Sequence, residues 1–289
     1  MSIRITFDNN VLDKYEGLPQ DQRQSLSNSL KSHYISLYPS PEFIEEMLSI
    51  IESKRAELLS PRAAWLLEVL SGRPLCYHGE IIISELSGER NLFLEAGTSR
   101  RLHEVLKSIS NGYWPTEFDE LGQQLRNKKA RYVADYKVEQ DRFRAHFGYG
   151  KIDAGPKTLE VFEEKYWDEW RQQLVEDICR KSRIPHPESR SKEILNHVID
   201  FPYLNVFLKV QAVMYYWYFV LNRKIEAGDL YDAGQLVYMA GLDWMVTEEK
   251  KLHEIFGMVF SAPKRIMTFD QFTNAIERRN ERSGVTSPR

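Results

Sequence analysis

The sequence predicts an α/β fold in which helices cover both faces of a parallel β-sheet. Short apolar, β-branched runs alternate with helical patterns near the amino end and again near the carboxyl end of the chain. From about residue 50 to about residue 200 the pattern is mostly helical, with breaks at SGRPL, SNGYWPTE, FGYGKIDAGP and SRIPHPESRS. We therefore expect strands from both ends of the chain to share one sheet.

The amino-terminal strands are short. Ile3 to Phe7 alternates and is rich in β-branched residues, which predicts a strand with Asp8 at its carboxyl end. A helix is expected to begin within Val11 to Tyr15, and the polar stretch LPQDQRQSLSNSLKSH predicts another. Tyr34 to Tyr38 predicts a second strand.

A helix is expected to follow this second strand. Ser40 is a good N-cap, and Pro41 suits the first helical position. Apolar residues then recur at helical spacing, at Phe43, Ile44, Met47, Leu48 and Ile51.

The carboxyl-terminal part predicts two more strands, each followed by a helix. Asp229 to Ala240 is an apolar-faced helix, and Trp244 to Thr247 is a short strand. KKLHEIF predicts a short helix. Arg265 to Thr268 predicts the last strand, and Phe269 to Arg278 the last helix.

Composition indicates a globular protein. The 289 residues suffice for one large domain or two, 42% of them are hydrophobic, and the net charge is −3. Any basic surface for nucleic acid must therefore be local. Cys76 and Cys179 form no CxxC motif, and the start MSIRITFDNN lacks the apolar region of a secretory signal, so we expect a cytoplasmic protein.

The most apolar run, Tyr203 to Leu221, has the length of a membrane span. It contains Asn205, Lys209 and Gln211, and its tyrosines lie in mid-run rather than at its ends. These features favour a buried helix, and we expect no membrane association. The segment YYWYF within the run is accordingly interpreted as core.

Acidic residues follow several predicted strands. Asp8 follows the first, Glu45 and Glu46 lie early in the helix after the second, and Glu248 and Glu249 follow WMVT. Asp232 lies near the start of its helix. Parallel neighbouring strands would gather these acids at one sheet edge, where they would repel one another unless a divalent cation such as Mg²⁺ or Mn²⁺ is bound. Spacing alone supports this carboxylate cluster only weakly.

Four motifs resemble those of the PIN domain family, metal-dependent nucleases that cut mainly RNA. FDNNVLDKY is similar to the family's opening strand with its Asp-x-Asn, and YPSPEFIEEML to its second strand and helix. YDAGQLVYMAGLDWMVTEEKKL resembles the third element, and RIMTFDQFTNAI the closing strand and helix. The matching positions are Asp8, Asn10, Val11, Leu12, Ser40, Glu46, Met47, Asp232, Ala233, Ala240, Asp243, Thr247 and Glu249.

The resemblance implies a three-layer α/β/α sandwich with a central parallel sheet of about five strands. Residues 1–52 and 203–280 would form the PIN-like nuclease domain, and 281–289 a flexible tail. About 150 residues, far more than in compact members, separate the second and third motifs, and residues 53–202 would form a helical insertion.

The resemblance also implies phosphodiester hydrolysis by a water that Mg²⁺ or Mn²⁺ activates. Under it, the acids of the three upstream motifs bind the metal, and Glu249, or its neighbour Glu248, completes the cluster. Asn10 orients an acid or a bound water, and Thr247 hydrogen-bonds an acid or the phosphate. The ligands from the three upstream motifs are Asp8, Glu46, with Glu45 as its rival, and Asp232.

The sequence also suggests partners for this protein: a nucleic acid, an inhibitory protein and further copies of the chain. A basic stretch, Arg126, Lys128, Lys129 and Arg131, would grip a nucleic-acid backbone, with Tyr132, Tyr136 and Phe143 stacking on bases; the alternative is a solvated helix face with its aromatics packed inward. Small family members are often toxins held by an inhibitory partner protein. The insertion would provide substrate grip or a homo-oligomer interface.

Two other functions are weighed against a ribonuclease. Glu249 stands where the family usually has Asp, which favours a catalytically inactive PIN-like module for nucleic-acid binding or assembly. An aspartyl phosphatase ranks lower, because that chemistry commonly uses Asp-x-Asp after the first strand and the third position here is Asn10.

Overall fold

The computed structural model describes residues 2–31, 34–48, 54–70, 74–89, 91–93, 95–114, 117–147, 158–224, 226, 228–261 and 263–282. The predicted break FGYGKIDAGP lies, except for its first residue, outside the described residues, as do residues 283–289 of the predicted tail.

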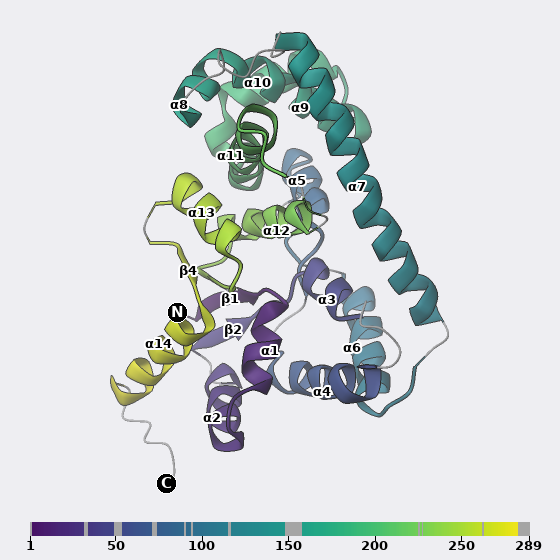
Figure 1. Ribbon diagram of the computed structural model, residues 1–289, viewed down its shortest axis with the longest axis vertical. Helices are drawn as coiled ribbons and strands as arrows, with labels where there is room; N and C mark the ends of the chain where they lie inside the picture. Colours follow the sequence, from purple (N-terminus) through teal and green to yellow (C-terminus); the bar gives the residue numbers. More distant parts are fainter. Residues whose placement is uncertain are drawn as a thin grey trace.

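The centre of the molecule is a parallel sheet of four strands in the order β2-β1-β3-β4 (Figure 1). The strands are β1 (Ile3–Phe7), β2 (Ile35–Leu37), β3 (Trp244–Val246) and β4 (Arg265–Met267). All four lie where the sequence predicts them. About five strands were expected, and the described residues form four.

Side chains of the strands alternate between two hydrophobic cores, one on each face of the sheet. Ile5 and Phe7 of β1 point into one core together with Val246 of β3. Met245 of β3 and Ile266 of β4 point into the other. This period of two is the geometry of a β-strand, and it confirms that helices cover both faces of the sheet.

The first core lies between the sheet and the helices drawn below it in Figure 1. These are α2 (Gln20–Lys31), α4 (Ser60–Val69), α6 (Ala96–Ser110) and α14 (Phe269–Arg282). Two shorter helices, α1 (Asn10–Glu16) and α3 (Pro41–Leu48), follow β1 and β2 at the carboxyl edge. Ser40 caps α3 as predicted, because its Oγ accepts a hydrogen bond of 3.1 Å from the Phe43 amide.

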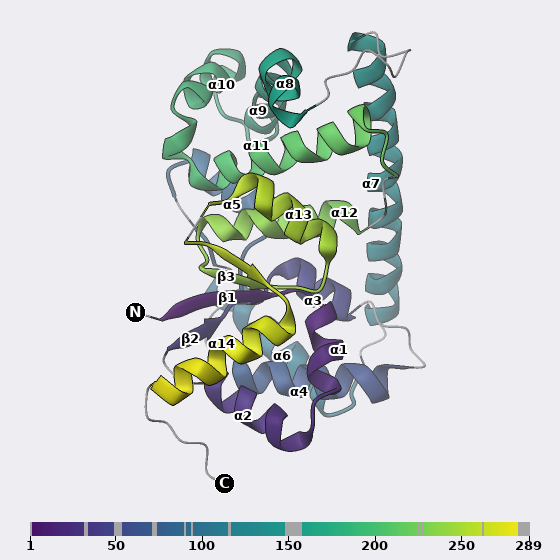
Figure 2. The same ribbon diagram turned by 60° about the vertical axis from the view of Figure 1, so that its left-hand side comes forward.

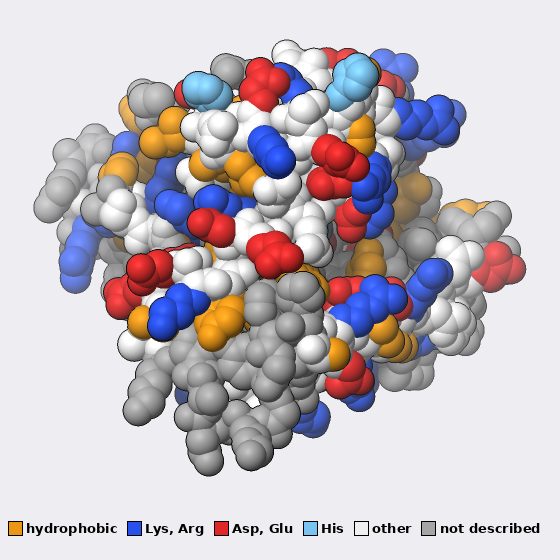
Figure 3. Space-filling model, turned by 90° about the horizontal axis from the view of Figure 1, so that it is seen from above, with side chains coloured by type: hydrophobic (Ala, Val, Ile, Leu, Met, Phe, Trp, Pro, Cys, Tyr) orange, Lys and Arg blue, Asp and Glu red, His pale blue; other side chains and the backbone are white. Residues whose placement is uncertain are grey.

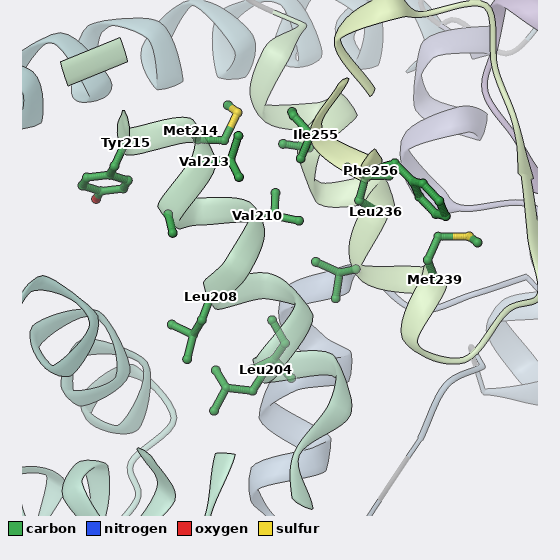
Figure 4. Close-up of a cluster of buried hydrophobic side chains, with 14 of the residues drawn as sticks. Leu204, Leu208, Val210, Val213, Met214, Tyr215, Leu236, Met239, Ile255 and Phe256 are labelled. Atoms are coloured by element: carbon green, nitrogen blue, oxygen red, sulfur yellow. The ribbon is translucent and has the colours of Figure 1, made fainter. Parts of the chain in front are cut away.

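The second core lies above the sheet and joins it to the upper helices. Helix α12 (Asp229–Gln235) continues as a 3₁₀ segment, η7 (Leu236–Ala240), and α13 (Lys250–Val259) follows β3. Figure 4 shows Leu204, Leu208 and Val210 of α11 (Pro202–Tyr215) beside Leu236 and Met239 of η7 and Ile255 and Phe256 of α13.

The remaining helices extend this second core upwards. They are α5 (His78–Leu86), the long α7 (Glu117–Phe147), α8 (Leu159–Phe162), α9 (Asp168–Lys181) and α10 (Pro187–Asn196). The π-helical turn η4 (Glu163–Trp167) joins α8 to α9, the 3₁₀ turn η5 (Val198–Asp200) joins α10 to α11, and the π-helical turn η6 (Tyr216–Val220) continues α11. Another π-helical turn, η2 (Arg55–Leu59), leads into α4 in the first core. Helix α7 runs along the long axis of the molecule, on the side where α1 and α3 lie (Figure 2).

Residues of the predicted insertion, 53–202, therefore belong to both cores. Leu66 and Ile109 pack in the first core with Phe7. Phe143 and Trp167 lie in the second core, which also contains Leu236. The insertion and the sheet thus share their hydrophobic interiors.

The aromatic run is core, as predicted. All of Tyr215 to Phe219 is buried, and Tyr136 of α7 contacts the rings of Tyr215, Tyr218 and Phe219. Phe143 is fully buried as well. Tyr136 and Phe143 are thus packing residues and not base platforms. No helix in the described part of the chain has the length and apolarity needed to cross a membrane.

Candidate functional site

The carboxyl ends of β1 and β3 bring distant parts of the sequence together. The two strands are parallel neighbours, and the Asp8 amide donates a 3.0 Å hydrogen bond to the Val246 carbonyl. Asp8 and Thr247, the residues that follow these strands, therefore lie side by side. This is the edge at which open parallel sheets usually carry their sites.

Asp8 is the centre of a hydrogen-bond network. Its side chain is buried, and Oδ1 accepts bonds from the Asn9 amide (2.7 Å) and Gln235 Nε2 (3.4 Å). Oδ2 accepts bonds from Asn10 Nδ2 (2.6 Å) and Thr247 Oγ1 (2.8 Å). A carboxylate has about four acceptor positions, so protein donors use all of them. The contacts predicted for Asn10 and Thr247 are present, and their part in catalysis stays a prediction.

The loop after β3 is fixed by the same residues. Asn10 Oδ1 accepts a 3.0 Å bond from the Glu248 amide, and Thr247 Oγ1 accepts one of 3.0 Å from the Glu249 amide. The Glu248 carboxylate turns the other way, because its Oε1 accepts a 2.8 Å bond from the Phe269 amide at the start of α14. That contact gives Glu248 a role at a helix terminus and favours Glu249 as the fourth acid.

Gln235 is a site residue that the sequence analysis missed. It is fully buried, and while its Nε2 donates to Asp8, its Oε1 has no hydrogen-bond partner among the described residues. Asp232 lies one turn earlier on the same face of α12 and is half-buried, with its Oδ2 near the backbone of Gly228. This spacing of three from Asp232 was the signal that could have revealed Gln235.

Glu42 is the acid of α3 that the structure buries most deeply. Only 1% of it is exposed, and it accepts a 2.7 Å bond from the Tyr238 hydroxyl and lies 2.9 Å from His78 Nδ1. Tyr238 follows Gln235 by three residues, so one face of α12 and η7 contacts both Asp8 and Glu42. Burial, and then the charge of Glu42, raises the pKa of Tyr238 well above its usual value.

The sequence analysis named Glu46, with Glu45 as its rival, and did not name Glu42. Glu46 is half-buried, and Glu45 accepts a bond from the Tyr77 hydroxyl. Glu42 lies one turn before Glu46 on the same helical face, so the helical period could have suggested it.

The insertion supplies one wall of this region through His78, the first residue of α5. The ring lies against Gly234 of α12, where an added Cβ would be only 2.6 Å from Cε1 and 2.7 Å from Nδ1. Glycine at position 234 therefore permits the close approach of His78. The side chain of His78 is 30% exposed, so solvent reaches it.

The donors at the site suit a hard cation. Among the described residues, no three or more His, Cys, Asp or Glu side chains form a group that could hold a metal ion. Mg²⁺, however, is commonly bound by one or two carboxylates, with waters and substrate phosphates as its other ligands. Asp8 is a carboxylate at this edge, although protein donors occupy its acceptor positions, and Gln235 Oε1 is a carbonyl oxygen with no hydrogen-bond partner among the described residues. Metal binding by Asp232, Glu46 and Glu249 stays a prediction.

In the basic stretch of α7, Arg126 and Arg131 are exposed. Arg126 donates to Gln123 Oε1 at 3.0 Å, and Arg131 lies 3.9 Å from Asp135 one turn away. The side chains of Lys128 and Lys129 lie outside the described residues. On the face seen from above, described Lys and Arg side chains are interspersed with Asp and Glu (Figure 3). That face therefore lacks the single-sign field expected of a nucleic-acid surface.

These features define an α/β protein with a polar site at the carboxyl edge of a parallel sheet. A scan of protein-family models finds none that matches the chain, and no curated protein or solved structure is significantly similar to it. The resemblance to the PIN domain family accordingly stays a prediction.

Proposed function

We propose that this chain is a metal-dependent phosphodiesterase with a PIN-like three-layer domain, acting as a ribonuclease with RNA as its substrate. One observation carries the proposal: the buried Asp8 carboxylate lies at the carboxyl end of a central strand, next to a buried carbonyl oxygen of Gln235 that lacks a partner among the described residues. A buried acceptor without a donor is costly, and a cation would satisfy it.

The protein's own residues would prepare the site. Asn10 and Thr247 hold Asp8 in one orientation, since each also accepts a backbone N–H from the loop after β3. Asp8 and Gln235 would hold Mg²⁺ or Mn²⁺, with Asp232 and Glu249 as further acids. A bound Mg²⁺ or Mn²⁺ would supply an activated water and neutralise charge on the phosphate. An inhibitory protein partner and a homo-oligomer stay predictions.

The direct test is cleavage of a fluorescently labelled single-stranded RNA. We expect cleavage with Mg²⁺ or Mn²⁺, none with EDTA, and none by Asp232→Asn. The matched control is Asp243→Asn, which removes an equal charge at the other end of β3, where Asp243 accepts bonds from Arg4. Cleavage by Asp232→Asn at the wild-type rate would refute this site.

The second candidate is a catalytically inactive module on the same scaffold. The observation that favours it is that protein donors already use the acceptor positions of Asp8. Titration calorimetry with Mn²⁺ separates the two. A nuclease should bind the ion in a manner that Asp232→Asn weakens, whereas an inactive module should show no binding that depends on this residue.

A further inference from the structure

A cationic pocket lies on the outer side of β4, two strands from β1, the strand that Asp8 follows. Its volume is about 490 Å³, within the range of ligand pockets. The pocket is lined by Phe256, Lys264, Arg265, Ile266, Met267, Gln271, Asn274, Ala275 and Arg278. This lining includes three cations and no acid.

One face of α14 forms the wall of this pocket. Gln271, Asn274, Ala275 and Arg278 follow the spacing of a single helical face, while Phe269, Phe272 and Ile276 on the opposite side pack into the first core. The wall therefore offers two amides and a guanidinium, with a small residue between them that leaves room.

Within the described part of the chain, no carboxylate pairs with the arginines of the pocket. Arg265 and Arg278 are exposed, and neither forms an ion pair with a described residue. Lys264 differs, because its amine donates to the Leu242 carbonyl and burial lowers its pKa. The acidic residues of α14 whose side chains are described, Asp270 and Glu277, do not line the pocket. Two guanidinium groups without a carboxylate partner among the described side chains, beside amide donors, are suited to phosphate.

The edge of the sheet adds backbone groups. β4 is an outer strand, and its end residues face β3: the Arg265 amide donates to Asp243, and the Met267 carbonyl accepts from Thr247. Successive residues of a strand alternate in direction, so the N–H and C=O of Ile266 point outward, towards the pocket.

The pocket adjoins the candidate site. The Met267 carbonyl accepts a hydrogen bond from the Thr247 amide, and the Glu248 carboxylate accepts one from the Phe269 amide, the first of α14. Asp8 follows β1 and Met267 ends β4, two strands away, so they are separated by about 10 Å across the sheet. A stacked single strand covers that distance in about three nucleotides, at ~3.4 Å each.

We infer that this pocket binds the phosphate backbone of a single-stranded RNA, beside the site where the strand is cut. The inference rests on the proposed function for its substrate class. Arg265 and Arg278 contact phosphates, and Gln271 and Asn274 donate hydrogen bonds to them. The pocket, rather than the basic stretch of α7, gives the protein its grip on RNA.

The test is the binding of a labelled single-stranded RNA in EDTA, followed by fluorescence anisotropy over a range of salt concentrations. Changing Arg265→Gln and Arg278→Gln together should weaken binding about tenfold or more. It should also reduce the slope of log affinity against log salt by about 1.4, because two phosphate contacts are lost. Asn274→Asp should also weaken RNA binding, because it replaces an amide donor by a negative charge while the size of the side chain hardly changes.

The matched control is Arg126→Gln with Arg131→Gln, which removes the same charge from α7 and should leave affinity within about twofold. Equal losses in the two double variants, or none in the pocket variant, would overturn the inference. So would a poly-glutamate peptide that binds the pocket as tightly as RNA, which would assign it to an acidic protein segment. The binding assay contains EDTA, so RNA can bind without being cleaved. Failure of the pocket proposal can therefore be distinguished from failure of the proposed nuclease function.

Discussion

Replacing Asp8 by Asn tests whether the carboxylate is stabilised by its donors or strained by neighbouring acids. The amide keeps the shape of the side chain but exchanges one acceptor oxygen for a donor. In its best orientation the new NH₂ takes the place of Oδ1, which accepts bonds from Gln235 and the Asn9 amide. The Gln235 amide can flip so that its oxygen accepts from the NH₂, but the Asn9 N–H is a donor only and loses its acceptor. One charge-assisted bond of 2.7 Å is lost there, which costs about 2–3 kcal/mol.

The assay is urea unfolding of wild type and Asp8→Asn, followed by tryptophan fluorescence without metal. Asp21→Asn, an exposed acid in the first turn of α2, is the matched control and should change the free energy of unfolding by at most about 1 kcal/mol. If Asp8→Asn proves as stable as wild type, or more stable, repulsion among acids dominates at this site. Our account of Asp8 as a satisfied acceptor would then be wrong.

Three further outcomes are expected. Gly234→Ala should destabilise the protein by about 1–2 kcal/mol, because its Cβ would lie 2.6 Å from the His78 ring. In a His78→Ala background the same change should instead stabilise α12, and the urea midpoints of wild type, the two single variants and the double variant test both outcomes. Burial raises the pKa of Tyr215 to about 12, so the unfolded chain loses this proton first. Ionisation of Tyr215 should therefore lower stability between pH 10 and 12 by up to about 3 kcal/mol, and Tyr215→Phe should remove this share of the total loss in alkaline unfolding curves, beside that of the other buried tyrosines. Glu248→Ala should cost about 1 kcal/mol, since the Phe269 amide at the start of α14 loses its acceptor, and an unchanged thermal midpoint would contradict that role.

The strands were predictable because their signal is local. Ile3 to Phe7 and the residues around 35, 245 and 266 are short apolar runs bounded by polar turns, and a parallel sheet follows from the helices between them. Asp8 was identified in the same way, because it directly follows a strand, whereas Asn10 and Thr247 were identified only through the resemblance to the PIN motifs.

Glu42, Gln235 and His78 could not be identified with comparable ease. Their roles depend on how α3, α5 and α12 pack together, and no pattern within one segment encodes that packing. Glu42 in a first helical turn suggests a dipole interaction, and the burial that makes it notable comes from Tyr238, which follows it by 196 residues.

The wide separation of Asp8 and Thr247 also bears on protein synthesis. The two residues are 239 positions apart, yet one hydrogen bond joins them. At ordinary translation speeds a ribosome adds that length of chain in about 10 to 50 s. Throughout that interval the nascent polypeptide carries Asp8 and Asn10 without Thr247, so the hydrogen-bond network around Asp8 cannot be completed until residue 247 has been added.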